Sequence, residues 1–526
     1  MRYVKNHIES FLNNFNKIHL LFKFSIIYSA FLLFPQDLVL GEVKDYNILD
    51  YGAKSNCNTL NHIYIQAAID DAYKNGGGKV IVPPGIFLTG SFYLKSNVEL
   101  QIDKGAVLVG STDISDYKNI DDWKALILAE NQSNIKITGD GIIDGQGRSL
   151  ALKIDSLFYA GKLDSIYYNK NRKRPNEHIR PELIKFYKCD SIEIKNINLK
   201  NSSCWVQTYQ LCSNLKIDNI KVISDAYWNN DGLDIVDCKN VHVFNCYINS
   251  ADDGICLKSE DSSALNENIV IENNTIRSSA SAVKFGTASS GGFKNITIKN
   301  IKVFDTFRSA IALESVDGGI LEDVYIKNIT AYNTRNAVFI KLGHRNVDGK
   351  IGTLKNIVIK DIKVHIPFNV PDLNYEIRGP ELSFIHNPFP ASITGLPENF
   401  IENVTLENFE IVYPGKGNNG LANLPLFKLK DVPENEKEYP EFHMFGELPS
   451  WAFYIRHVKN LTMKNFIIVA ENPDYRPAFV FDDVEKLNLE KIDILEDEID
   501  KHQIILFNVK DYFIDDKLEK ELFIIK

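Results

Sequence analysis

Three aspartates, Asp231, Asp252 and Asp253, lie in one stretch of the chain, from Trp228 to Ser259, each beside a glycine or another small residue. Roughly twenty residues separate the first from the pair, about the length of one turn of a stacked β-coil. If the chain winds in coils, successive strands rise by about 4.8 Å and the three carboxylates meet on one surface. Carboxylates that converge in a groove supply the acid and the base that hydrolysis of a glycosidic bond requires.

Carboxylates one coil apart repel each other when both are ionised, so we expect one of them to keep its proton near neutrality. The protonated carboxyl would then serve the leaving oxygen, while an ionised partner activates water or attacks carbon. Because Asp252 and Asp253 are adjacent, an extended backbone would send them to opposite faces, and a bend at Gly254 is needed for both to reach the groove. The alternative is that Asn-Asp-Gly and Asp-Asp-Gly are only turn sequences that end coils.

A short repeat supplies the elements that would position these aspartates. Copies such as SNLKIDNIKV at Ser213 and KNITIKNIKV at Lys294 alternate apolar and polar residues, turn at Asn or Asp, and continue into a second strand. Between Asp190 and Glu322 the copies are roughly 23 to 28 residues apart, which is typical of a solenoid. One unit cannot bury its apolar face, whereas stacked units form a continuous core between parallel strands. The sequence therefore predicts an all-β, single-stranded parallel β-helix, with hydrogen-bonded ladders of Asn at the turns.

The N-terminal region differs from the repeats. Residues 1–41 combine basic residues with the apolar run Phe24–Phe34, which predicts a signal peptide or a membrane-anchoring leader and a secreted, periplasmic or cell-surface protein. Residues 42–526 are predicted to form one β-helix domain. Within it, a helix around Ile63–Lys74 would cover the open end of the stack, where backbone groups are otherwise unpaired.

Composition excludes several classes of function. A hydrophobic fraction of 44% and a charged fraction of 24% are ordinary for a soluble globular protein, and a net charge of −10 argues against nucleic-acid binding. The seven cysteines are an odd number, and Cys189, Cys212 and Cys238 share one position of the repeat, so we expect small buried side chains rather than a disulfide framework. No glycine-rich phosphate loop or Cys/His ligand spacing predicts a cofactor or a metal. A monomer is the default for a solenoid of this kind.

Several motifs resemble one known family. NND (Asn229–Asp231), followed one coil later by ADDGICLKS (Ala251–Ser259), resembles the N-T-D and G-D-D motifs of glycoside hydrolase family 28, the polygalacturonase family. GGGKVIVPPG (Gly76–Gly85) and RPELIKFYKC (Arg180–Cys189) also look like landmarks of that family, and the resemblance covers nearly all of the chain after the leader. It implies a right-handed, pectin-lyase-like β-helix and metal-independent hydrolysis of α-glycosidic bonds in a pectic polysaccharide, with inversion. By position, Asp252 is similar to the general acid, while Asp231 and Asp253 match the pair that activates water.

The chain departs from the family pattern at two places. The family's G-H-G reads ASA here, with Ser281 in place of the histidine, and its R-I-K corresponds to SAIALES, with Ala312 and Glu314 at the cationic positions. We expect an acidic residue there to repel a galacturonate carboxylate. Other cations would have to replace the missing ones, although each is as readily explained by solvation or packing of the coil. The residues predicted to bind substrate are Asn229, Lys258, Lys284, Arg308, His344 and Arg345.

The departures leave the substrate open between homogalacturonan and a rhamnogalacturonan or decorated pectin. Two other functions fit a parallel β-helix. A polysaccharide lyase would depend on calcium and give an unsaturated product. A non-catalytic carbohydrate-binding β-helix would keep its ligand after substitution of Asp252.

Overall fold

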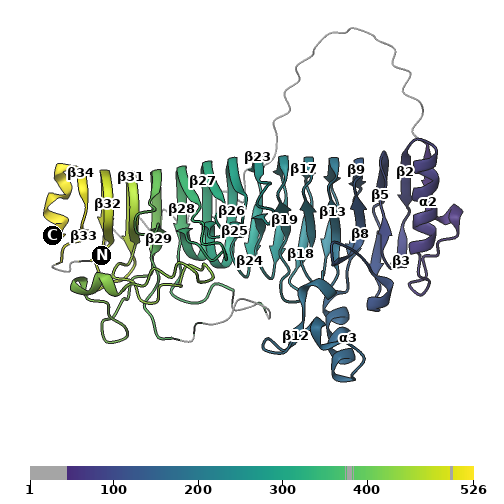
Figure 1. Ribbon diagram of the computed structural model, residues 1–526, viewed down its shortest axis with the longest axis horizontal. Helices are drawn as coiled ribbons and strands as arrows, with labels where there is room; N and C mark the ends of the chain where they lie inside the picture. Colours follow the sequence, from purple (N-terminus) through teal and green to yellow (C-terminus); the bar gives the residue numbers. More distant parts are fainter. Residues whose placement is uncertain (1–43, 373–374, 376–381, 383, 498–500, 526) are drawn as a thin grey trace, which may run out of the picture.

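Parallel strands stack in register along one axis, from the helix α2 at one end to the C-terminal strands at the other (Figure 1). The computed structural model describes residues 44–372, 375, 382, 384–497 and 501–525. The chain forms an all-β, single-stranded right-handed parallel β-helix, which confirms the fold predicted from the repeat and the resemblance. The predicted leader, residues 1–41, lies outside the described residues. Among those described, no helix combines the length and the apolar character needed to cross a membrane.

Three faces make up each coil. The first face begins at the N-terminal end with β1 (Asp45–Asn47), β2 (Gly78–Val82), β5 (Val98–Ile102), β9 (Ser133–Thr138), β14 (Asp190–Lys195), β17 (Ser213–Asp218), β20 (Lys239–Phe244) and β23 (Asn266–Glu272). The second begins with β3 (Gly85–Thr89), β6 (Ala106–Gly110), β10 (Ile142–Asp144), β15 (Asn198–Lys200), β18 (Lys221–Ser224), β21 (Tyr247–Ser250) and β24 (Thr275–Ser278).

The third face carries the strands that follow the aspartates. It begins with β4 (Phe92–Tyr93), β8 (Trp123–Glu130), β13 (Glu182–Tyr187), β16 (Gln207–Gln210), β19 (Leu233–Val236), β22 (Ile255–Ser259) and β25 (Val283–Ser289). Beyond β25 long strands bend around the coil and join faces, namely β26 (Gly292–Ser315), β27 (Ile320–Leu342), β28 (Thr353–His365), β30 (Ile401–Tyr413), β31 (Phe453–Ala470) and β32 (Phe479–Leu495). On the third face β29 (Ala391–Thr394) lies between β27 and β31, and the stack ends with β33 (Ile504–Phe507), β34 (Lys510–Ile514) and β35 (Leu522–Ile525).

The helices and the antiparallel strands lie outside this stack. Helix α2 (His62–Lys74) packs Ile65, Ala68, Ile69 and Ala72 onto the first coils, which confirms the predicted N-terminal helix. An excursion between β10 and β13 holds α3 (Gly147–Tyr159) and the pair β11 (Tyr168–Asn169) and β12 (Arg174–Pro175), and β7 (Lys118–Ile120) pairs with β8. Short 3-10 helices are η1 (Ile48–Tyr51), η2 (Ile114–Asp116), η3 (Ser165–Tyr167), η4 (Glu177–Ile179), η5 (Leu426–Asp431) and η6 (Asp516–Glu521).

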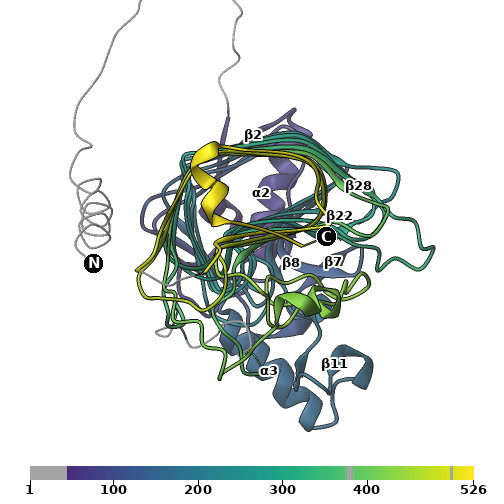
Figure 2. The same cartoon turned by 90° about the vertical axis from the view of Figure 1, so that its left-hand side faces the viewer.

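The alternation of the repeat fills the interior of the coils. Strands such as β20 bury every second side chain, and the buried residues join one apolar cluster along the molecule. Cys189, Cys212 and Cys238 belong to that cluster and are unpaired thiols, as predicted from their shared position. A second apolar cluster lies outside the coils, under the segments 384–398 and 414–450. Those segments emerge on the same side as α3 and β12 (Figures 1 and 2).

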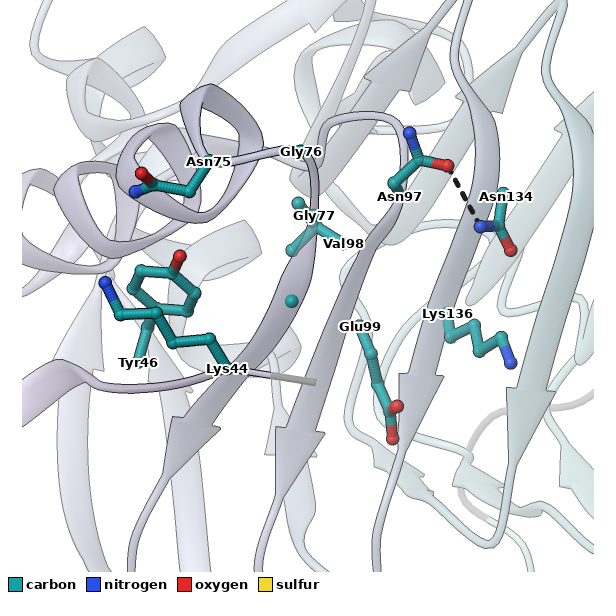
Figure 3. Close-up of a pocket in the computed structure, with 11 residues that line it drawn as sticks. Lys44, Tyr46, Asn75, Gly76, Gly77, Asn97, Val98, Glu99, Asn134 and Lys136 are labelled. Atoms are coloured by element: carbon teal, nitrogen blue, oxygen red, sulfur yellow. Dashed lines mark hydrogen bonds between the residues drawn. The ribbon is translucent and has the colours of Figure 1, made fainter. Parts of the chain in front are cut away.

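Asparagines at the turns form the predicted ladders. Near the N-terminal end the Asn134 side-chain amide donates to Asn97 Oδ1 at 3.0 Å, beside a surface hollow of about 530 Å³ (Figure 3). Further along, Asn328 Nδ2 donates to Asn300 Oδ1 at 2.7 Å and Asn300 Nδ2 to Asn273 Oδ1 at 2.9 Å. All three of these residues have φ of 56°. Asn tolerates this left-handed conformation and also bridges successive coils, which explains its recurrence at the turns.

Substitution of one asparagine of the ladder tests this explanation. We expect Asn300→Ala to lower the free energy of unfolding by about 1–2 kcal/mol, because Ala pays the left-handed strain and loses the ladder bonds. Asn300→Gly should cost less, since glycine adopts the same φ without a Cβ. Urea denaturation would measure both, with Lys302→Ala on the adjoining exposed strand position as the control. A glycine variant less stable than the alanine variant would contradict the account.

Candidate active site

The loops that precede β19 and β22 stack the three aspartates. Val206 N–H donates to Asp231 O at 2.9 Å, and Gly232 N–H donates to Asp253 O at 2.8 Å. Asp231 and Asp253 therefore occupy the same position on successive coils, about one strand spacing apart. The backbone bends at Asp252 and Gly254, as predicted, and Ser250 Oγ donates to the carbonyl of Asp252 at 2.9 Å.

The glycine after each aspartate permits this close stacking. A Cβ built on Gly232 would lie 2.7 Å from Gly254 O and 2.5 Å from the Ile248 side chain. At Gly254 it would lie 2.5 Å from Ala282 O. A larger residue at either position would push the coils apart at the site, which is why the Asp-Gly sequence recurs one coil later.

The residues before Asp231 are fixed by buried hydrogen bonds. The Asn230 side chain is fully buried; its Oδ1 accepts from the N–H groups of Ala226 and Tyr227, and its Nδ2 donates to Cys204 O at 2.8 Å. Asn229, predicted to bind substrate, has φ of 58° and accepts from Arg180 Nη2 at 2.8 Å. These contacts give Asn229 a partner inside the protein and hold the loop rigidly above β19.

Lys258 lies between two carboxylates. Its Nζ is 2.9 Å from Asp231 Oδ2 and also contacts Asp234 Oδ1, and it lies 3.9 Å from the centre of the Trp205 ring. One ammonium thus serves two buried acids. Burial, only partly offset by Lys258, raises the pKa of Asp231 and raises the pKa of Asp234 to about 6. The pair therefore favours retention of one proton, and Asp234 is a member of the site that the sequence did not single out.

The same acids could in principle hold a cation. Ligand atoms of Asp231, Asp234 and Cys256 lie within 4.8 Å of one another. Lys258 already contacts both carboxylates and supplies positive charge at this point, so a metal ion would have to displace its ammonium.

Asp252 and Asp253 differ in their electrostatics although they are neighbours. Burial and the Asp253 carboxylate raise the pKa of Asp252 above its ordinary value. Burial would also raise the pKa of Asp253, but Lys284, Arg308 and Lys258 outweigh it and hold that pKa below its ordinary value. Lys284 Nζ is 3.2 Å from Asp253 Oδ2, and Ser281 N–H donates to Asp253 Oδ1 at 3.0 Å. At a pH between these two pKa values, Asp252 carries a proton and Asp253 is ionised.

Glu314 differs from the expectation of a repelling carboxylate. Its side chain is 2% exposed, and Lys284 Nζ lies 3.9 Å away. Burial raises the pKa of Glu314 to about 8, so the side chain is mostly neutral at pH 7. The predicted repulsion of a galacturonate carboxylate by Glu314 is therefore largely removed at neutral pH.

The other predicted cations also have carboxylate partners. Arg308 Nη1 lies 2.6 Å from Oε1 of Glu441, a residue of the segment 414–450. His344 Nε2 lies 3.2 Å from Glu436, and Arg345 Nε lies 2.7 Å from Asp317. The structure thus gathers Lys258, Lys284 and Arg308 around the aspartates, whereas the contacts of His344 and Arg345 are made with other acids.

Sequence reasoning missed the aromatic and loop residues of the site. Trp205, which lies under Lys258, stacks on Trp123 with ring centres 4.6 Å apart, and Trp123 contacts His178 at 4.2 Å. Tyr439 Oη accepts from Lys284 Nζ at 3.3 Å. Lys258 was among the predicted residues, but no repeat marks Trp205 or the residues of the long insertions.

The family model of glycosyl hydrolases family 28 matches residues 75–370, more than half of the chain and including all three aspartates.

The chain belongs to this family.

Curated relatives of this family-28 chain carry related descriptions. A "Probable polygalacturonase" of Vitis vinifera is 28% identical over 333 residues, 60% of this chain and 59% of that protein. An "Exo-poly-alpha-D-galacturonosidase" of Dickeya chrysanthemi is 25% identical over 69% of this chain and 71% of its own length. The chain thus spans less than two thirds of the Vitis vinifera relative.

Solved structures share the fold of this family-28 chain. A family 28 exopolygalacturonase of Yersinia enterocolitica aligns with a TM-score of 0.56 at 17% identity, covering 90% of this chain and 78% of that one. A polygalacturonase of Erwinia carotovora ssp. carotovora aligns with a TM-score of 0.54 at 20% identity, covering 73% and 96%. At these identities the likeness is one of fold alone.

The charge balance at Lys258 can be tested by stability. Lys258→Met leaves Asp231 and Asp234 buried without their cation, and we expect a loss of about 3–5 kcal/mol in the free energy of unfolding at neutral pH. The folded-state pKa of both acids is raised, so ionising them disfavours the folded protein. This cost begins as pH rises through about 4, the pKa of the unfolded acids, and increases above that pH. The loss should therefore be smaller at pH 4 than at pH 8.

Urea denaturation at both pH values would measure this effect. Lys221→Met, at an exposed lysine of β18, is the control and should change stability by no more than about 0.5 kcal/mol. An equal loss at both pH values would mean that Lys258 contributes packing rather than charge.

Proposed function

We propose that this protein hydrolyses α-glycosidic bonds of a pectic polysaccharide, with Asp252 as general acid and Asp253 as general base. The observation that carries the proposal is the placement of Asp252 beside Asp253, whose carboxylate lies 3.2 Å from Lys284 Nζ. In that setting the pKa of Asp252 is raised and the pKa of Asp253 is lowered. An acid and a base poised in this way are what single-step hydrolysis of a glycoside requires. Family membership and the descriptions of the relatives support the choice of a pectic substrate.

In the proposed reaction, Asp252 donates its proton to the oxygen of the departing sugar as the glycosidic bond breaks. Asp253 takes a proton from the water that attacks the anomeric carbon from the opposite face, which inverts its configuration. Asp231, held by Lys258, orients that water by hydrogen bonding. Afterwards Asp252 is ionised and Asp253 protonated, and exchange with solvent restores both. None of these steps assigns a role to a metal or an organic cofactor.

A rhamnogalacturonan or decorated pectin is the second candidate substrate, and one observation favours it. Among the described residues, each cation predicted to bind a galacturonate carboxylate is already paired with an acid of the protein: Lys258, Lys284, Arg308, His344 and Arg345. An additional substrate carboxylate would have to compete with those acids. A neutral sugar next to the cleaved bond avoids this competition.

We further propose that the protein acts outside the cell, as a monomer. The basic and apolar character of residues 1–41 supports export, and a polymeric cell-wall substrate requires it. The continuous core of the solenoid supports a monomer, since each coil already buries its apolar face against the next.

Substitution of the proposed acid tests the function. Asp252→Asn removes the proton donor, and we expect kcat to fall by about 10²–10⁴-fold. Wild type and variant would be assayed in parallel on polygalacturonic acid and on rhamnogalacturonan, with products separated by chromatography. Asp261→Asn, at an exposed aspartate near the end of β22, is the matched control and should retain full activity.

The outcomes separate the candidates. Saturated galacturonate products from polygalacturonic acid, lost in Asp252→Asn, would support a polygalacturonase. Cleavage of rhamnogalacturonan alone would support the second candidate. Unsaturated products would indicate a lyase, and activity that survives Asp252→Asn would contradict the assignment of the acid.

The pH profile provides an independent test of Asp253. In wild type the acidic limb of kcat/KM reports protonation of Asp253, whose pKa Lys284 helps to lower. Removing that positive charge in Lys284→Gln should raise the pKa of Asp253 and move the acidic limb to higher pH by about 1–3 units. Lys284→Arg keeps the charge and should leave the limb nearly in place. An unmoved limb in Lys284→Gln would show that Asp253 is not the group that must be ionised.

A further inference from the structure

We propose that the segment 414–450 closes the groove on the C-terminal side of the aspartates, so that the protein removes short units from one end of a polysaccharide chain. The inference rests on the proposed function, since it concerns how the same site receives its substrate. It follows from the contrast between the two sides of the aspartates along the third face of the β-helix.

The N-terminal side remains partly exposed. From Lys258 the aromatic rings of Trp205 and Trp123 lead to His178, each stacked on or tilted against the next. Beyond them a hollow of about 670 Å³ opens between the β7–β8 region and the excursion that carries β11 and β12, lined in part by His178, Tyr167 and Lys124. Aromatic faces beside polar groups suit sugar rings, because a ring presents apolar C–H groups on one face and hydroxyls at its edge. This side has room for a continuing chain.

The C-terminal side is covered within two coils. Register along the third face runs from Cys256 on β22 to Lys284 on β25 and Ala312 on β26, then to Phe339 on β27. Ala312 and Phe339 are each 1% exposed. They pack outside the coil in the second apolar cluster, whose covering residues from the insertions include Phe389, Leu429, Val432, Phe442, Phe445 and Leu448.

The segment 414–450 also contacts two cations of the site, and we call this segment the cover. Tyr439 is hydrogen-bonded to Lys284, and Glu441 forms an ion pair with Arg308. Lys284 in turn contacts Asp253. Because neighbouring strands are about 4.8 Å apart, the cover begins within about 10 Å of the aspartates. That length admits one or two sugar units and no continuing polymer. The cover is anchored by an apolar core rather than by a few polar contacts, so we expect it to stay closed during turnover.

Product length tests the inference directly. Polygalacturonic acid and rhamnogalacturonan would be digested by wild type, and early products and viscosity followed together. We expect a monosaccharide or disaccharide as the first product, with little loss of viscosity per bond broken. A ladder of longer oligomers with a rapid fall in viscosity would overturn the inference and leave the proposed hydrolysis intact. No cleavage of either polymer would overturn the proposed function and this inference with it.

A variant at the edge of the cover adds a second readout. Tyr439 is 52% exposed, so Tyr439→Ala should preserve the fold while it lengthens the closed end of the groove. We expect the ratio of the next longer product to the first product to rise several-fold. Tyr512→Ala, at an exposed tyrosine of the remote strand β34, should leave the ratio unchanged. An unchanged ratio in Tyr439→Ala would overturn the assignment of this segment as the boundary of the site.

Discussion

Stacking in register places chemically equivalent positions of successive coils about one strand spacing apart, and the active site depends on how charge is balanced at that distance. Carboxylates brought together in this way cannot all be ionised when water is excluded. Cations from later coils partly compensate the negative charge: Lys258 contacts Asp231 and Asp234, and Lys284 contacts Asp253. Because the cations compensate the carboxylates unequally, the carboxyl groups differ in proton affinity. This difference is the basis of the proposed acid and base.

The same cations connect the chemistry to the shape of the groove. Lys284 is paired with Asp253 and is hydrogen-bonded to Tyr439. Arg308 is paired with Glu441. Both cations therefore contact the segment 414–450, which covers the C-terminal coils. Their positive charge is therefore used within the protein, to tune the aspartates and to hold the edge of the cover. In this account, the limited space on that side, rather than a free cation, determines which sugar it accepts.

The sequence was sufficient for the fold and for the position of the aspartates, because both follow from a repeat. Alternation and turn asparagines recur in most coils, so the β-helix, the buried cysteines and the asparagine ladders were predictable. Asp231 and Asp253 were expected to meet because one coil separates them. Partners brought by insertions were not predictable: nothing in the local sequence places Tyr439 on Lys284 or Glu441 on Arg308, since long loops follow no period. The raised pKa of Glu314 depends on burial, which its sequence position did not reveal.

In the proposed mechanism Asp252 holds a proton while Asp253, its neighbour in the chain, does not. Neutron diffraction from a deuterium-exchanged crystal, at a pH on the plateau of the activity profile, would locate that proton directly. We expect a deuteron on a carboxyl oxygen of Asp252, none on Asp253, and a fully deuterated ammonium on Lys284. A deuteron on Asp253 with Asp252 ionised would contradict the proposed mechanism.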